Sequence, residues 1–266
     1  MTSWVRFQSA DGTVGIGVLS SAGHIAVHAG GLFDAPRPTG ASVELGAVQL
    51  LAPCHPSKII ALWNNFHALA ARLGKSAPSH PLYLIKPSTS VIGPSASIER
   101  PRGYHGKIAF EGELGVVIGR TCRAAPIEQA AHHIFGYTCV NDLTAVGFMN
   151  ENPDFVQWCR AKGCDTFGAL GPAIVADFDW RSASVVTRVA GSERQRYALS
   201  DMIFSPEEIV SRLSHDMTLL PGDLIACGTS LGVGSIPDGG TVEITIDGIG
   251  TLRNTLAATA DAAIRT

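Results

Sequence analysis

The sequence lacks the marks of several large classes of protein. No apolar run approaches the roughly 20 residues that are needed to span a bilayer, and residues 1–6 lead directly into strand-like sequence instead of a secretory signal. Lys and Arg are not clustered, and the net charge is −3. We therefore expect no membrane partner, no nucleic-acid partner and a cytoplasmic location.

Paired cysteines are also missing. The six cysteines are scattered without a C-x-x-C pair, and the nine histidines include no H-E-x-x-H motif. In a chain of 266 residues, this argues against a disulfide framework and against a zinc site. We interpret the cysteines as reduced thiols in or near the core.

What is present is a large apolar fraction with few charges. Hydrophobic residues make up 45% of the chain and charged residues 16%, which favours a large core and a subunit interface. The length suits one large domain, alone or with a small appendage. Residues 1–52 are Gly-rich and strand-like, and Pro53 and Pro56 mark a junction. We predict a small N-terminal β domain over residues 1–52 and a main domain over residues 57–266.

The larger part reads as strands with a few helices. Strand-like segments outnumber helical ones and do not alternate regularly with them, which predicts an α+β, β-rich fold with an antiparallel or mixed sheet. Residues 257–266 are Ala-rich, and we expect this end to fray. The expected helices span 64–74, 126–134 and 206–213, and the expected strands span 57–63, 82–85, 110–119, 223–227 and 241–246.

Two carboxylates, Glu111 and Glu113, lie two residues apart in the apolar run at 110–119. Residues i and i+2 of a strand point to the same face, and two close like charges beside a core are costly unless something neutralises them. A divalent cation, which prefers oxygen ligands, would do so. Asp142, at the end of another apolar run, is a third candidate ligand. The alternative is that the Glu residues form a solvated face of an edge strand.

These acids belong to a series of motifs that resembles the fumarylacetoacetate hydrolase superfamily over nearly the whole chain. Each motif alone is weak evidence, and their common order and spacing carry the resemblance. The matching blocks are 86–88, 110–114, 136–142, 162–167, 170–172, 200–204, 221–225, 228–234 and 249–252.

The resemblance implies a fold, a cofactor and a class of substrate. Members of this superfamily have a rolled, mixed β-sheet and are usually homodimers. They bind Mg²⁺ or Mn²⁺, and sometimes Ca²⁺, through carboxylates. They act on small 2-oxo acids and 1,3-dicarbonyl acids by hydrolysing C–C bonds, by decarboxylation or by isomerisation.

The resemblance also assigns roles around the expected metal. By position, Glu111, Glu113 and Asp142 resemble the metal ligands. Lys162 resembles the catalytic lysine that lies beside the metal and the enolate oxygen of the substrate, where an ammonium adds fixed positive charge. The alternative for Lys162 is a surface lysine that pairs with Asp165.

Further residues resemble the substrate-binding elements of the superfamily. Thr229, with the backbone of Gly228, resembles the loop that holds the substrate carboxylate, and Lys86 lies in a Lys-Pro element near the pocket. Ser230 stands where the superfamily usually has Pro. Residues 146–158 lack the Arg that often follows the third metal ligand.

The predicted lid, residues 65–74, departs from the superfamily pattern Asn-Tyr-x-x-His-x-x-Glu. Leu69 and Arg72 occupy the His and Glu positions, and His67 comes two residues early, on a different helix face. His67 could serve as a relocated base, or the enzyme could need no activated water. Arg72 could grip a second substrate carboxylate or be an ordinary exposed residue.

Two enzymatic hypotheses and one non-enzymatic hypothesis remain open. The leading hypothesis is a metal-dependent hydrolase that cleaves a C–C bond in a 2-oxo or 1,3-dicarbonyl acid, in aromatic-compound catabolism. The alternative is an isomerase or decarboxylase of a 2-oxo or hydroxymuconate-type acid. The third is a non-catalytic protein that binds small acids.

Overall fold

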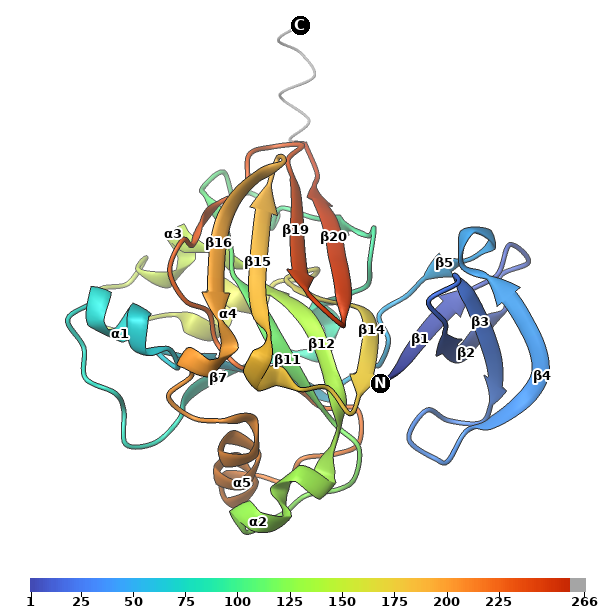
Figure 1. Ribbon diagram of the computed structural model, residues 1–266. Coiled ribbons are helices and arrows are strands. Elements are labelled where there is room, and N and C mark those ends of the chain that lie inside the picture. The colour runs from blue at the N-terminus through green and yellow to red at the C-terminus, as the bar shows by residue number, and fades with distance from the viewer. Residues whose placement is uncertain (259–266) are drawn as a thin grey trace, which may run out of the picture.

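The computed structural model of the protein describes residues 1–258, and the predicted fraying beyond them lies outside the described residues. Within this range, three sheets and a few short helices make up the fold (Figure 1). No helix of residues 1–258 has the length and apolar character that crossing a bilayer requires.

The N-terminal strands form an antiparallel meander on one side of the molecule (Figure 1). Val5, Phe7 and Ile25 pack with Ala173 of the larger part into a small core. β1 also pairs with β14 of the larger part, so this unit extends the main sheet, and the predicted domain division stays a prediction. The strands are β1 (Thr2–Gln8), β2 (Val14–Leu19), β3 (His24–Ala29), β4 (Arg37–Glu44) and β5 (Gln49–Leu50).

The main sheet runs in the order β4-β3-β2-β1-β14-β12-β11-β17-β6-β7, with β5 on β1 and β8 on β14. β6 runs parallel to β17 and β8 parallel to β14, whereas the other pairs are antiparallel. Nearly every position of β11 and β12 is buried, which explains their apolar sequence. The strands are β6 (Lys58–Trp63), β7 (Leu82–Pro87), β8 (Val91–Ile92), β11 (Gly112–Ile118), β12 (Ile134–Asp142), β14 (Gly168–Ala176) and β17 (Leu224–Ala226).

A five-stranded sheet in the order β16-β15-β19-β20-β9 covers one face of the main sheet, and β13-β10-β18 form a small third sheet. Val185 of β15 and Ile244 of β19 share one core with Leu114 of β11. The prediction of a β-rich α+β fold with mixed sheets is therefore confirmed. The strands are β9 (Ser97–Ile98), β10 (Ile108–Phe110), β13 (Thr144–Ala145), β15 (Ser184–Val189), β16 (Ser192–Ala198), β18 (Gly234–Ser235), β19 (Thr241–Ile246) and β20 (Gly250–Leu256).

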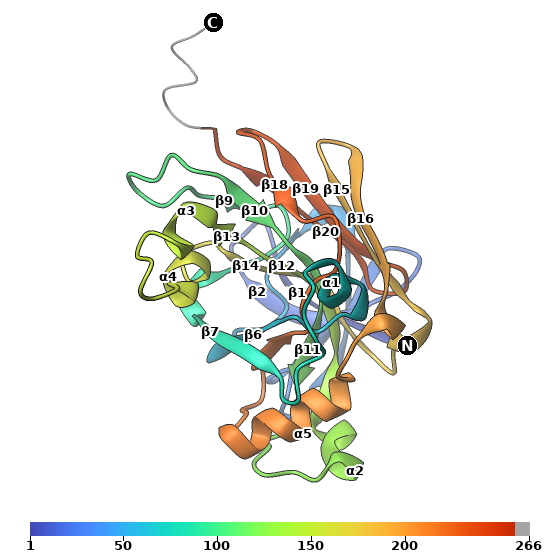
Figure 2. The same ribbon diagram turned by 90° about the vertical axis from the view of Figure 1, so that its left-hand side faces the viewer.

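The helices lie at the periphery. α5 begins with Pro206 and is capped by a reciprocal pair, in which Ser205 and Glu208 each accept the other's backbone N–H. α2 packs against α5 beneath the sheets, whereas α1, α3 and α4 lie on the side that faces the viewer in Figure 2. The helices are α1 (His67–Arg72), α2 (Ile127–Ala130), α3 (Val146–Met149), α4 (Trp158–Lys162) and α5 (Pro206–Asp216).

The predicted lid helix is shorter than expected. Asn64 has a left-handed backbone (φ 58°) and Phe66 is extended, so the helix begins only at His67. It ends at Arg72, two residues before the predicted stop at Gly74.

Two other predicted segments also need correction. The helix expected at 126–134 is α2 followed by one turn of 3₁₀ helix, and Ile134 already opens β12. The strand expected at 110–119 is interrupted at Glu111, between β10 and β11.

Candidate metal centre and active site

The three acids that the sequence predicted to converge do lie together. Glu113 is on β11, Asp142 is the last residue of β12, and Glu111 lies in the break before β11. Carboxylate oxygens of all three lie within 4.8 Å of one another. The backbone fixes this arrangement, because the N–H of Asp142 donates to the carbonyl of Glu111 (2.9 Å) and the N–H of Glu111 donates to Asn141 Oδ1 (3.1 Å).

The environment of Glu113 suits a cation ligand. Its side chain is fully buried, and Oε2 accepts a hydrogen bond from the N–H of Gly228 at 2.8 Å. Oε1 has no hydrogen-bond partner among residues 1–258. Burial, reinforced by Asp142 and Glu111, raises the pKa of Glu113 well above its usual value. A buried carboxylate oxygen that lacks a donor, with two more acids beside it, fits a hard divalent cation.

Lys162, the last residue of α4, lies against this cluster. Its side chain is only 3% exposed, and Nζ donates to Glu111 Oε1 and to Asp142 Oδ2, both at 2.7 Å. Burial alone would lower the pKa of Lys162, but the two carboxylates raise it above its usual value. Lys162 is therefore a buried ammonium, and the surface-lysine alternative is excluded.

A second buried lysine holds the other oxygen of Asp142. Lys86 lies on β7, and its Nζ donates to Asp142 Oδ1 and, at 2.8 Å, to the carbonyl of Phe167. Burial lowers the pKa of Lys86 although Asp142 opposes the shift. Burial would raise the pKa of Asp142, but Lys162 and Lys86 together lower it. Asp142 therefore stays ionised and in a fixed orientation.

The loop that follows β17 brings Gly228 and Thr229 to the cluster. Gly228 has φ 90°, and a Cβ there would lie 3.3 Å from Asn65 Cβ and from the carbonyl of Leu62, so glycine suits this close approach. Thr229 Oγ1 donates to the carbonyl of Gly112 at 3.1 Å. Thr229 is thus fixed beside the backbone that separates the two Glu residues.

Gln195 of β16 supports that loop and was not anticipated from the sequence. It is buried, donates through Nε2 to Thr229 Oγ1 (2.8 Å) and accepts through Oε1 from the N–H of Gly112 (3.1 Å). Its strand reads Ser-Glu-Arg-Gln-Arg-Tyr-Ala, and such a polar run is typical of a solvated edge. Nothing in that local pattern distinguishes Gln195, because its partners lie far away in the chain.

A cavity of about 310 Å³ opens next to Glu111 and Thr229. Leu69 of the lid helix, Leu73 directly after it and Trp158 of α4 contribute to its lining. Leu69 is the position at which the superfamily pattern has His. In this structure, therefore, the lid presents apolar side chains to the cavity.

His67 and Arg72 lie on the same helix but are exposed and do not line the cavity. Their predicted roles as base and as carboxylate ligand stay predictions. The base of the lid is firmly held, because Asn65 Nδ2 donates to the carbonyl of Cys227 (2.8 Å) and Asn65 Oδ1 accepts from the N–H of Phe204 (2.9 Å).

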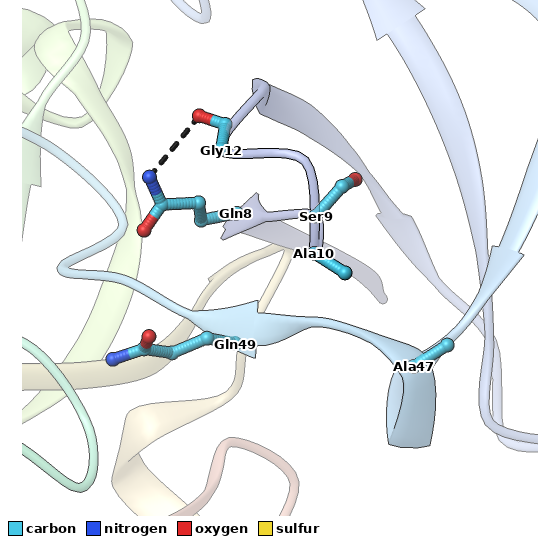
Figure 3. A pocket seen from close by; sticks show the side chains of 6 residues that line it. All are labelled: Gln8, Ser9, Ala10, Gly12, Ala47 and Gln49. Carbon is cyan, nitrogen blue, oxygen red and sulfur yellow. Dashed lines mark hydrogen bonds between the residues drawn. The ribbon is translucent and has the colours of Figure 1, made fainter.

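A second hollow, of about 350 Å³, lies on the N-terminal unit (Figure 3). Gln8 and Gln49 extend along it, and Gln8 Nε2 donates to the carbonyl of Gly12 at 3.1 Å. None of the residues that line this hollow is ionisable. It therefore offers neither an acid–base group nor a set of metal ligands.

Residues 58–257 match the family described as Fumarylacetoacetate (FAA) hydrolase C-terminal, and the chain therefore belongs to that family. Residues 3–53 match a second family, described as Rv2993c-like, N-terminal. The chain is similar to Protein Rv2993c of Mycobacterium tuberculosis, with 44% identity over 94% of this chain and 93% of that one. It is also similar to oxaloacetate tautomerase YisK of Bacillus subtilis, with 38% identity over 79% of this chain and 74% of that one.

Solved structures with this fold carry several activities. A 2-hydroxyhepta-2,4-diene-1,7-dioate isomerase from Mycobacterium marinum superimposes with a TM-score of 0.88 at 38% identity, covering 98% of this chain and all (100%) of that one. A fumarylpyruvate hydrolase from Pseudomonas aeruginosa, in complex with Mn²⁺ and pyruvate, superimposes with a TM-score of 0.71 at 28% identity, covering 79% and 92%. The family thus includes isomerases, a tautomerase and hydrolases.

Proposed function

We propose that the protein is a divalent-metal-dependent isomerase that interconverts the keto and enol forms of a 2-oxo acid. One observation carries the choice over hydrolysis. Leu69 and Leu73 of the lid line the cavity, whereas His67 is exposed and outside its lining. Hydrolysis consumes a water molecule that a base within hydrogen-bond reach must activate, and the lid supplies none there. Keto–enol exchange consumes no water: it moves one proton from C3 to the 2-oxo oxygen, and solvent can accept the proton from C3 and return one to the oxygen. The similarity to a tautomerase and to a dioate isomerase supports the same choice.

In this proposal, some residues bind the metal or the substrate, and others stabilise charge or fix a ligand in place. Glu111, Glu113 and Asp142 would hold Mg²⁺ or Mn²⁺, which when bound supplies Lewis-acid stabilisation of an enolate. Lys162 keeps a fixed positive charge within 2.7 Å of two of these acids, where it would stabilise the same developing charge. Thr229 and the backbone of Gly228 would orient the substrate carboxylate, and Lys86 keeps Asp142 in place.

The test compares two reactions on the same Mn²⁺-loaded protein. Keto–enol exchange of oxaloacetate and of acetylpyruvate would be followed by ultraviolet absorbance, and C–C cleavage of acetylpyruvate by the release of pyruvate. We expect accelerated exchange with at least one substrate, negligible cleavage, and loss of the exchange in Glu113→Ala. Release of pyruvate at a rate comparable to exchange would overturn the choice of isomerase. The absence of any turnover would favour the non-catalytic small-acid binder.

Hydrolysis is the second candidate. His67 opens the lid helix two residues from Leu69, which does line the cavity, so a rewound lid start could carry the imidazole inward. The similarity to a fumarylpyruvate hydrolase also supports this candidate. A cytoplasmic location and a part in aromatic-compound catabolism stay predictions from the sequence.

A further inference from the structure

The cavity beside the acidic cluster has one polar end, and the rest of its lining is mostly apolar. Glu111, Thr144 and Thr229 line the end next to the proposed metal site. The remainder of the lining is almost entirely apolar, with Asn64 as its one polar member within the described chain. A substrate whose acidic end lies at the cluster must therefore place its far end against hydrocarbon and aromatic surface.

That apolar wall, which consists of Trp63, Leu69, Leu73, Met149 and Trp158, comes from separate parts of the chain. Leu69 comes from α1 and Leu73 directly follows it, Met149 comes from α3 and Trp158 from α4. These three helices lie on the side that faces the viewer in Figure 2. The indole rings of Trp63 and Trp158 lie 6.1 Å apart, centroid to centroid, at an interplanar angle of 49°. Contributions from four elements indicate a shaped wall rather than a chance gap between loops.

Positive charge is absent from the described lining, which contains no Lys, Arg or His. At the polar end, Lys162 is held by Glu111 and Asp142. Near the apolar wall, two further cations lie over aromatic rings. Lys75 Nζ lies 5.4 Å from the centroid of Trp63, and the Arg160 guanidinium lies 4.2 Å from that of Phe148 and also pairs with Glu151. A second carboxylate placed against this wall would exchange part of its hydration for apolar contacts without gaining a charged partner, which is unfavourable.

We infer that this cavity prefers 2-oxo acids whose far end is apolar and uncharged over acids of equal length whose far end places a second carboxylate against the apolar wall. This inference rests on the proposed function, because it requires a 2-oxo acid to bind at the acidic cluster. Each methylene that the apolar wall buries should tighten binding about fourfold, from the usual transfer free energy of a CH₂ group.

A matched pair of ligands tests the inference without turnover. 2-Oxohexanoate and 2-oxoadipate have carbon chains of equal length and differ in a terminal methyl or carboxylate. Binding of each to the Mn²⁺-loaded protein would be measured by calorimetry, with pyruvate as the common reference. We expect 2-oxohexanoate to bind at least tenfold more tightly than 2-oxoadipate.

A charge placed in the wall should reverse this preference. Leu73 is 48% exposed at the end of α1, so Leu73→Arg should fold normally. It should tighten 2-oxoadipate and weaken 2-oxohexanoate, each by several-fold. Val14→Arg adds the same charge at a similarly exposed apolar position (47%) on β2 of the N-terminal unit, and it should change neither affinity.

The outcomes distinguish a failure of the inferred substrate preference from a failure of the proposed function. If 2-oxoadipate binds wild-type protein as tightly as 2-oxohexanoate does, while pyruvate also binds, the inference is wrong and the proposed function stands. If neither acid nor pyruvate binds in the presence of Mn²⁺, the proposed function fails and the inference fails with it. Equal effects of Leu73→Arg and Val14→Arg would show that net charge, not the apolar wall, controls the affinity.

Discussion

The ammonium of Lys162 lies 2.7 Å from Asp142 Oδ2, so that the last residue of α4 meets the last residue of β12. Both side chains are buried, and each keeps the other ionised against the effect of burial. The same ammonium also donates to Glu111. It therefore links Glu111 to Asp142 within the acidic cluster. Fixed charge of this kind needs no reorganisation when an oxyanion develops.

Lys162→Met should impair turnover much more than it impairs metal binding. The ammonium would act on charge that develops in the transition state, and loss of such an interaction lowers kcat and kcat/KM together. We expect kcat to fall by about a hundredfold or more, by analogy with the loss of one oxyanion donor, while calorimetry reports a retained Mn²⁺ affinity. Lys107→Met, at an exposed position, is the control. An unchanged kcat with a raised KM would make Lys162 a binding residue only.

Mn²⁺ should stabilise the protein through Glu113. At a concentration of about 100 times Kd, a ligand that binds only the folded state contributes about 2.7 kcal/mol. For a chain of this size, that free energy corresponds to a rise in Tm of roughly 5–10 °C. Glu113→Ala should remove the Mn²⁺-dependent shift and the metal-dependent activity, whereas Glu128→Ala, on the exposed surface of α2, should keep both. A full shift in Glu113→Ala would remove Glu113 from the ligand set.

Replacement of Asp223, which lies away from the candidate site, should strongly destabilise the protein. Its buried carboxylate accepts from Ser57 Oγ (2.6 Å) and from the N–H of Leu220 (2.8 Å) and pairs with Lys58, which ties the start of β6 to the turn before β17. Asp223→Ala should lower the free energy of unfolding in urea by about 3–5 kcal/mol, because it leaves buried donors and a charge without their partner. Asp247→Ala, on the surface, should change it by less than about 0.5 kcal/mol. Equal stabilities for the two variants would contradict this account.

The acidic cluster could be predicted from the sequence because its signal is local. The spacing of Glu111 and Glu113, together with Asp142 at the end of an apolar run, is visible in short segments, and the same holds for the strand-rich fold class. Gln195 could not be predicted, since its partner Gly112 lies 83 residues away and its own strand reads as solvated.

The start of the lid helix could not be predicted for a different reason. Good helix formers at 68–73 led to a predicted helix that began at residue 64, but the long-range hydrogen bonds of Asn65 to Phe204 and Cys227 hold residues 64–66 in a non-helical conformation. Tertiary contacts of this kind override a weak local preference.

The protein should be a homodimer. The family resemblance and the low charged fraction of 16% motivate this prediction. Light scattering at micromolar concentration should give twice the 27.9 kDa of a single chain. A mass equal to one chain across that concentration range would contradict the prediction.

His67→Ala separates the two candidate reactions most directly. In the described lid, His67 is exposed and Leu69 takes the place toward the cavity, so keto–enol exchange should stay within about threefold of wild type, since removal of a working base typically costs 10²–10⁴ in rate. The variant would be assayed with Mn²⁺ on oxaloacetate, for exchange and decarboxylation, and on acetylpyruvate, for C–C cleavage. His132→Ala, also exposed, controls for the loss of an imidazole. If cleavage is measurable in wild type and collapses in His67→Ala alone, while decarboxylation survives, His67 activates water and the enzyme is a hydrolase with a relocated base. If all activities stay near wild type, His67 is structural, and the isomerase or decarboxylase hypothesis moves ahead of hydrolysis.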